Sequence, residues 1–167
     1  MSRFAIVRLF VCAVPLFLLG CAQQSQVAAT GGDPIRISYS VGPCYGTCPV
    51  YQVAIEANGA TFFNGERHTS VEGTQQISNN AATFQATLSR LAPWKPETGT
   101  TQSTTDCEPR ATDQQNYTVI WTNAAFEQAV LEHDTGCHSE AGRQLTETLR
   151  SLDSLVGVAP WVRSPAQ

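Results

Sequence analysis

Two cysteines four residues apart, Cys44 and Cys48, are the residues of this chain best suited by type and spacing to do chemistry. They lie in the stretch from Gly42 to Tyr51, with a glycine midway between them and a proline on either side. Such a pair can form a structural disulfide, act as a thiol–disulfide redox couple or bind a soft metal ion. Redox pairs of the thioredoxin type have two intervening residues at a helix N-terminus. Here three residues intervene and a strand-like run follows, which favours the structural disulfide.

The N-terminus predicts which compartment these cysteines occupy. A short basic region precedes an almost unbroken apolar run, Leu9 to Leu19, that is too short to span a bilayer comfortably as a helix. This order predicts a secretory signal peptide over residues 1–20. Its end, Leu18-Leu19-Gly20-Cys21, resembles the lipobox of bacterial lipoproteins, in which the signal is cut before the cysteine and the thiol receives a lipid. We therefore expect lipidation at Cys21, because several acyl chains make a stable membrane anchor.

The expected location is the cell envelope, with the folded part facing the periplasm. In Gram-negative lipoproteins an aspartate after the lipidated cysteine often signals retention in the inner membrane. Ala22 stands at that place here, which by analogy favours the outer membrane if the cell has one. Residues 21–34 are expected to form the lipidated cysteine and a flexible polar tether. A single domain is expected over residues 35–160.

The charge balance argues against nucleic acid as a partner. The chain has ten basic and fourteen acidic residues. Loss of Arg3 and Arg8 with the signal peptide leaves eight basic residues, a formal charge of −6. Nucleic-acid-binding surfaces are basic, and this chain has no basic run. It also has no glycine loop of the kind that binds phosphate, and we expect no cofactor.

The number of cysteines predicts two disulfides. Cys12 leaves with the signal peptide and Cys21 is lipidated, so four cysteines remain in an oxidising compartment. Four cysteines allow three pairings, and the count alone leaves all three open. The simplest pairing joins Cys44 to Cys48 and Cys107 to Cys137. On the chain-entropy description these would stabilise the fold by about 2 and about 3.7 kcal/mol.

A copper or zinc site is a third hypothesis for the cysteines. Thiolates and imidazoles suit Cu(I) and Zn, and a pair spaced like Cys44 and Cys48 can bind copper with a distant histidine. The other candidate ligands are His133, Cys137 and His138, which lie close together in sequence, and Asp106 and Glu108, which flank Cys107. Against a closed zinc site, the cysteines lack paired Cys-x-x-Cys spacing. His68 stands alone and is expected to be a solvated strand residue. We predict no metal ligands and no catalytic residues.

The elements that must position the cysteines begin with strands. Alternating apolar residues predict strands over residues 35–39 and 50–56, on either side of the first cysteine pair. Asn58-Gly59 is a strong hairpin signal, since both residues tolerate the positive φ of a type I′ turn. Three further features complete the predicted meander: a strand over residues 61–63, a turn at Asn64-Gly65 and a strand over residues 67–71.

A helix and a long loop are expected next. The helix is predicted from an N-cap at Ser78 to about Ala92, before Pro93. Its buried face is predicted at i, i+4 and i+7, which are Phe84, Leu88 and Leu91. Residues 95–115 have few apolar groups and are expected to form a surface loop that contains Cys107.

The last part of the chain predicts a hairpin and a second helix. Strands are expected over residues 117–121 and 126–131, although the second run also has helical character. Ser139 can cap a helix to about Leu155, whose buried stripe is Leu145, Leu149, Leu152 and Leu155. Trp161 is expected to pack back onto the domain. The order predicts an α+β domain, an antiparallel sheet of about five strands with two helices on one face.

The first cysteine pair also carries a family resemblance. The chain resembles a family of uncharacterised bacterial domains that begin with Cys-x-Gly-x-Cys-Pro-x-Tyr, followed by a strand and spaced glycines. The matching residues are Cys44, Gly46, Cys48, Pro49, Tyr51, Gly59, Phe63, Gly65 and Gly73. The resemblance covers residues 35 to 155, and its specific part is residues 42 to 73. It implies secretion and a shared fold, and it implies no activity.

No catalytic set is recognisable, so we expect a module that binds or scaffolds. The sequence has no Gly-x-Ser-x-Gly elbow, and Ser139 beside His138 is expected to be a helix cap. The expected partners are the membrane, through the N-terminal lipid, and an unknown envelope protein or small ligand. The alternative function is periplasmic thiol-redox or copper and zinc handling through Cys44 and Cys48.

Overall fold

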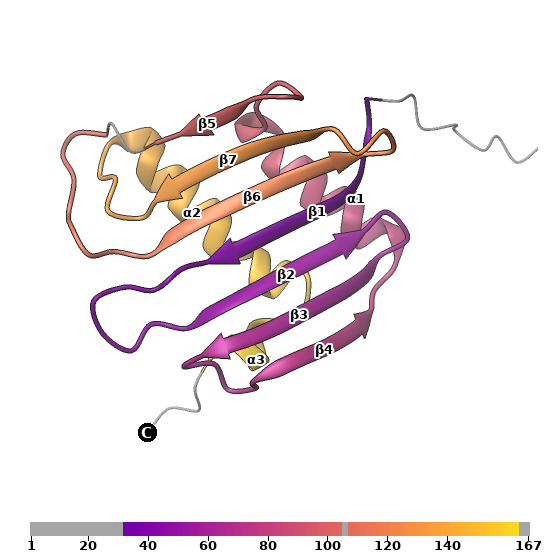
Figure 1. Ribbon diagram of the computed structural model, residues 1–167, viewed down its shortest axis with the longest axis horizontal. Helices are drawn as coiled ribbons and strands as arrows, with labels where there is room; N and C mark the ends of the chain where they lie inside the picture. The colour runs from indigo at the N-terminus through magenta and orange to yellow at the C-terminus, as the bar shows by residue number, and fades with distance from the viewer. Residues whose placement is uncertain (1–31, 105–106, 164–167) are drawn as a thin grey trace, which may run out of the picture.

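The computed structural model describes residues 32–104 and 107–163, in which seven strands and four helical segments follow one another. The strands are β1 (Pro34–Val41), β2 (Val50–Glu56), β3 (Ala60–Arg67), β4 (Gly73–Ser78), β5 (Thr101–Ser103), β6 (Asn116–Asn123) and β7 (Gln128–Asp134). The helices are α1 (Ala81–Leu91), the 3₁₀ turn η1 (Ala92–Trp94), α2 (Glu140–Leu155) and α3 (Ala159–Val162). The strands form one sheet in the order β4-β3-β2-β1-β6-β7-β5, and the helices lie behind one face of it (Figure 1).

The α+β class expected from the sequence is confirmed, but the sheet is larger than five strands. The pairs β1–β2, β2–β3, β3–β4, β1–β6 and β6–β7 are antiparallel. The edge strand β5 runs parallel to β7, inside the segment that we expected to be a loop. It is three polar residues long, so no apolar alternation marks it in the sequence. The strand interpretation of residues 126–131 is confirmed, with β7 beginning at Gln128.

The predicted turn at Asn64-Gly65 and strand over residues 67–71 are wrong. Both Asn64 and Gly65 lie inside β3, and the next strand is β4. Gly65 pairs with Tyr51 on one side and with Gly73 on the other. A Cβ at this position would collide with the carbonyl oxygen of Val71. This glycine therefore allows a close approach of two backbones, and not a turn.

Two local predictions also need correction. The hairpin at Asn58-Gly59 is present, but only Gly59 has a positive φ, of 93°. The turn is therefore not type I′; instead, the Asn58 side chain accepts a hydrogen bond from the Ala60 amide at 2.9 Å. The N-cap of α1 is Asn80, whose side chain accepts from the Thr83 amide at 3.2 Å. Ser78 is the last residue of β4. The predicted cap of α2 at Ser139 is confirmed.

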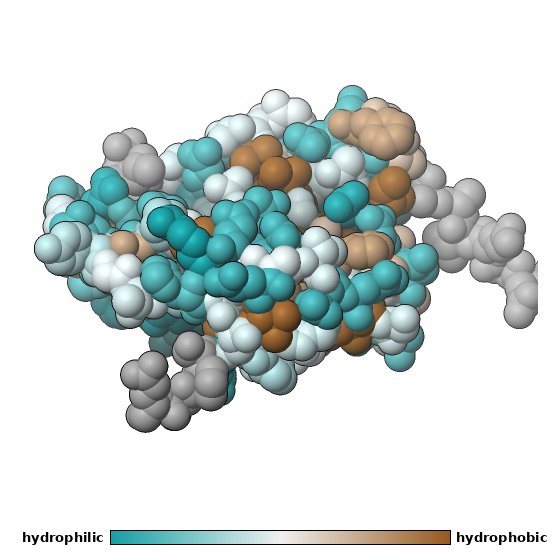
Figure 2. Space-filling view, turned by 60° about the horizontal axis from the view of Figure 1, so that its bottom comes forward, coloured by the Kyte–Doolittle hydropathy of each residue, from teal (hydrophilic) through white to brown (hydrophobic). Residues whose placement is uncertain are grey.

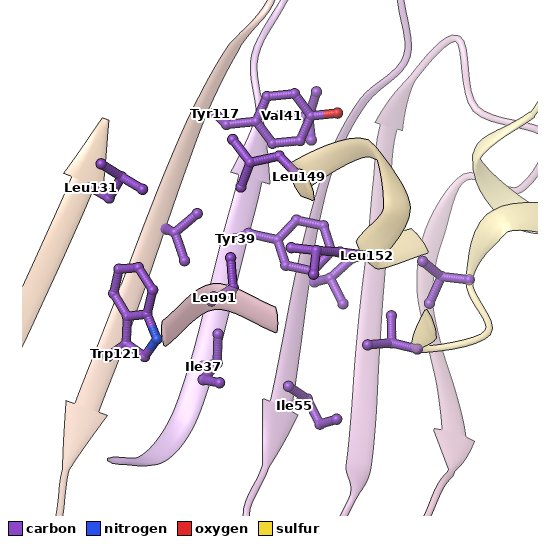
Figure 3. Packing of buried hydrophobic residues seen from close by; sticks show 14 of the residues in the cluster. Ile37, Tyr39, Val41, Ile55, Leu91, Tyr117, Trp121, Leu131, Leu149 and Leu152 are labelled. Atoms are coloured by element: carbon purple, nitrogen blue, oxygen red, sulfur yellow. The ribbon is translucent and has the colours of Figure 1, made fainter. Parts of the chain in front are cut away.

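One face of the sheet forms the core with the helices. Along β1, the side chains of Ile37, Tyr39 and Val41 are buried on this face. The leucine stripe predicted for α2 packs against them, as Figure 3 shows for Leu149 and Leu152. The predicted face of α1 is also confirmed, because Phe84 and Leu91 are buried and Leu88 packs against the cluster; Trp161 lies 5.6 Å from the ring of Phe63. No helix in the described part of the chain is long and apolar enough to span a bilayer.

A half-buried carboxylate fixes α2 to the sheet. The two oxygens of Asp153 accept hydrogen bonds from the hydroxyls of Tyr39, at 2.9 Å, and Tyr51, at 2.7 Å. Burial raises the pKa of Asp153 above its ordinary value, although the two tyrosine hydrogen bonds oppose this rise. Burial also raises the pKa of Tyr117 beside them to about 12. The tyrosine of the Cys-x-Gly-x-Cys-Pro-x-Tyr motif therefore has a structural role in the core.

Candidate functional site

Within residues 32–104 and 107–163, no helix covers the second face of the sheet, which is hollowed into a trough. The floor of the trough is Ser38 and Ser40 of β1 together with Ala54 of β2, all small residues. In register across the strands, Ala54 lies opposite Phe62, and Ser38 lies opposite Ile120. Large side chains thus stand on both sides of a small floor, and the hollow has a volume of about 630 Å³. This size falls in the range of ligand sites.

Uncharged hydrogen-bonding groups dominate the trough. The side chains that line it with a hydroxyl or an amide are Ser38, Ser40, Gln52, Asn64, Thr74, Thr118, Thr122 and Gln128. The hydroxyls of the two serines and of Thr118 and Thr122 make no hydrogen bond to any residue that the structure describes. Gln52 donates to Glu66 at 2.8 Å, outside the trough. The floor and sides therefore offer donors and acceptors that the fold does not use.

The trough is close to electrically neutral. Arg36 and Glu56 are its only charged lining residues within the described chain, and they pair with each other at 3.3 Å. No histidine or cysteine is among the described lining residues. No described serine or threonine hydroxyl of the lining makes a hydrogen bond to a basic side chain or a carboxylate.

Two exposed phenylalanines border the trough. Phe126, in the β6–β7 turn, is 81 % exposed, and Phe62 is 36 % exposed. From the β4 side of the molecule, Figure 2 shows a mainly hydrophilic surface with small, separate apolar patches. Strands β2 and β1 lie between β3, which carries Phe62, and β6, which leads into the turn with Phe126, so the two rings are separate contact points.

The first cysteine pair forms a disulfide in the β1–β2 loop. The Cα atoms of Cys44 and Cys48 are 5.7 Å apart. The loop rests on the segment before β6, since the Tyr45 amide donates to the Asp113 carbonyl at 3.1 Å and the Gln115 side chain donates to the Pro49 carbonyl at 2.8 Å. Tyr45 is 90 % exposed at its tip. The pair joins two antiparallel strands, and neither cysteine lies at a helix N-terminus.

The second disulfide joins Cys107 to Cys137, whose Cα atoms are 5.4 Å apart. The structure thus contains the simplest of the three pairings. Cys137 is only 3 % exposed, and the Ser139 hydroxyl lies 3.3 and 3.4 Å from the two sulfurs. A Cβ on Gly142 would collide with the Cys137 sulfur. This disulfide therefore holds the loop that precedes β6 against the first turn of α2.

The residues of the metal hypothesis do not come together. His133 is buried, and its ring nitrogens lie 2.7 Å from the hydroxyls of Thr104 and Thr146. Burial lowers its pKa. His138 and Glu108 are exposed, and Cys137 is in a disulfide. The described residues contain no group of three His, Cys, Asp or Glu side chains placed to hold a metal ion.

Three other predicted positions complete this comparison. His68 is exposed, as expected, but it lies in the turn after β3 with a φ of 56°, and not in a strand. Cys21 and Asp106 lie outside the described residues.

The trough itself was not predicted from the sequence. Its only sequence signal is the run of small and hydroxyl side chains at alternate positions of β1 and β6, which is also typical of an ordinary solvated face.

The comparison with known proteins agrees with the resemblance noted at the cysteine motif. Residues 35–156 match the domain of unknown function DUF6438. No curated protein and no solved structure matches the chain. The match spans β1 to the end of α2 and so includes the trough, the disulfides and the carboxylate of Asp153. The chain belongs to the DUF6438 family of domains.

Proposed function

We propose that this chain is a lipid-anchored protein of the bacterial cell envelope that binds a ligand in the trough on the open face of its sheet. One observation carries the proposal: the described helices all cover one face of the sheet, and the other face is hollowed to about 630 Å³. Most residues of the trough lie on strands, and sites built on strands are held more precisely than sites on loops. The signal sequence and Cys21 supply the anchor in this proposal.

A photoreactive phenylalanine analogue tests the binding surface in growing cells. It is placed at Phe62 in the trough or, as the matched control, at the exposed Gln85 on α1. Ultraviolet light should then give a discrete adduct from position 62 and none from position 85. Equal adduct formation from both positions, or none from position 62, would overturn the proposal.

The anchor is tested separately. Cys21→Ala should leave the precursor uncut and without lipid, because the peptidase and the acyl transfer both require the cysteine. Mass spectrometry of the purified protein measures both outcomes. Normal cleavage of this variant would contradict the proposed lipid anchor, and it would not affect the proposal that the trough binds a ligand.

A second candidate function is thiol–disulfide exchange at Cys44–Cys48. It rests on the exposure of that loop, since exposed disulfides are the labile ones. The lack of a helix N-terminus beside either thiol counts against it. Thiol counting across a series of reducing potentials separates the two functions. Opening of Cys44–Cys48 alone at a mild potential, with the fold intact, would favour exchange, and joint opening of both disulfides with unfolding would favour binding.

A further inference from the structure

We infer that the ligand of the trough is an uncharged, polyhydroxylated chain, a glycan strand, that lies along β1. This inference rests on the proposed function, because it names the ligand class for the same surface. Three observations carry it. Four trough hydroxyls have no hydrogen-bond partner within the described chain, the lining is close to neutral, and the floor consists of small residues.

Four hydroxyls of the trough differ from most other threonine hydroxyls of the described chain. Many of those donate to backbone carbonyls, as Thr61 does to Gly59 at 3.0 Å and Thr148 does to Gln144 at 2.9 Å. Within the described chain, the four trough hydroxyls on β1 and β6 have no such partner. A hydroxyl both donates and accepts. An array of free hydroxyls therefore matches a ligand whose own groups also do both, which is the property of sugars.

The charge of the trough points the same way. Phosphate-bearing ligands, nucleic acids and acidic peptides need unpaired basic groups. The single arginine of the lining, Arg36, is already paired with Glu56 at 3.3 Å. A neutral ligand loses no charge solvation on entering such a site and gains hydrogen bonds there.

The floor and borders fit a glycan better than a protein. Protein interfaces are depleted of serine and alanine, yet the floor consists of Ser38, Ser40 and Ala54. The C–H faces of sugar rings are apolar and can pack on Phe62 and Phe126 at the borders, in keeping with the contact area that aromatic rings offer. From Arg36 to Ser40 the strand extends about 13 Å. A short oligosaccharide along β1 would therefore touch the whole floor.

The test uses the full-length chain, purified in a polyoxyethylene detergent that carries no sugar. The probe is a β-1,4-linked hexamer of N-acetylglucosamine, which is uncharged and carries both hydroxyls and amides. Calorimetric titration should show saturable binding. Polygalacturonate, a polyhydroxylated but anionic chain, should not bind.

Paired variants locate the binding. Ser38→Ala combined with Thr118→Val removes two trough hydroxyls with little change of shape and should weaken binding about tenfold, as expected for two lost hydrogen bonds. Thr148→Val removes a hydroxyl on α2 and should leave binding unchanged. The melting temperature of each variant shows whether it folds. Binding that the first pair leaves unchanged would overturn the assignment to the trough.

The outcomes also separate the ligand class from the proposed function. If the hexamer does not bind but position 62 still cross-links in cells, the site stands and the glycan is overturned. If glycoside hydrolases lower the mass of the cross-linked species, and proteases remove no second protein from it, the glycan is supported. A second copy of this chain in the adduct overturns the glycan in favour of self-association. With neither binding nor adducts, both the inference and the proposed function fail.

Discussion

The two faces of one sheet are used in opposite ways. On β1, Ile37, Tyr39 and Val41 are buried under the helices, while Arg36, Ser38 and Ser40 face the trough on the other side. The side chains alternate along the same strand. A single run of residues thus supplies both the core and the proposed binding surface. Changes at Ile37, Tyr39 and Val41 should therefore affect folding, and changes at Ser38 and Ser40 should affect binding.

The polar groups of the two faces differ in their partners. On the covered face, Asp153 is bonded to Tyr39 and Tyr51, and His133 lies between two threonine hydroxyls. Trp121 is an exception, because its buried indole nitrogen has no hydrogen-bond partner among the described residues. On the open face the hydroxyls of Ser38, Ser40, Thr118 and Thr122 have no partners in the described chain, although Thr74 donates to Asn64 at 3.5 Å. Polar groups bonded within the protein stabilise the covered face, and these four solvent-accessible hydroxyls can exchange water for a ligand.

The largest expected effect is a loss of stability from a core substitution, which distinguishes the covered face of the sheet from the open face. Leu149→Ala, on the covered face, should lower the free energy of unfolding by about 2.7 to 5 kcal/mol, because it leaves a cavity in the core. Ile120→Ala, on the open face, should lower it by about 1 kcal/mol or less, because solvent fills the space. Denaturant titration measures both. Similar losses would mean that the open face contributes to stability as the core does.

The two disulfides should differ in the same measurement. Replacing both Cys107 and Cys137 by alanine should lower the free energy of unfolding by about 3.7 kcal/mol. Replacing both Cys44 and Cys48 by alanine should lower it by about 2 kcal/mol, because Cys44–Cys48 closes a shorter loop than Cys107–Cys137. The comparison is sharpest when binding to the trough is measured alongside. Since both disulfides lie outside the trough, the folded variants should bind normally. A greater loss from the shorter loop would contradict the account.

Asp153 tests the buried polar network of the covered face. Asp153→Ala leaves the hydroxyls of Tyr39 and Tyr51 without their acceptor, and it should lower the free energy of unfolding by about 2 to 3 kcal/mol. Asp153→Asn keeps one acceptor oxygen and should lower it less. Chemical denaturation of the two variants at neutral pH gives the comparison. Equal losses would contradict this expectation, because they would show that the acceptor oxygen kept by asparagine contributes nothing.

The pH dependence of stability provides the smallest effect. Burial, aided by Arg150 and opposed by Asp134, lowers the pKa of His133 in the folded protein. Below pH about 6.5 the unfolded chain therefore binds a proton that the folded chain resists. Stability should fall as the pH decreases from 6.5 through the folded pKa, and it should level off below that. The stability of His133→Gln, measured from unfolding curves between pH 4 and 8, should lack the fall that is due to His133. A pH profile identical to that of the unsubstituted protein would rule out a contribution from His133.

The sequence predicts elements whose pattern is local, and it misses features that depend on neighbours. The bounds of β2 and the cap and stripe of α2 follow from alternation and from Ser139. Gly65 misleads, because its close contact with Val71 exists only once β3 and β4 are paired. The trough arises from strands β3, β2, β1 and β6 side by side, which no local pattern reveals. Which face the helices cover is likewise decided by tertiary packing, so the binding surface could be recognised only in the folded chain.

Oxidative footprinting of the three exposed aromatic residues of the described chain tests the central claim most directly. Hydroxyl radicals label Phe62, Phe126 and Tyr45 in isolated cell envelopes and in the purified protein, and mass spectrometry compares each residue with itself. If the trough is the binding surface, the two phenylalanines are protected in the envelope, and Tyr45, on the disulfide loop, is labelled equally in both samples. Protection of Tyr45 with unchanged labelling of both phenylalanines would contradict the account and assign the contact to the Cys44–Cys48 loop.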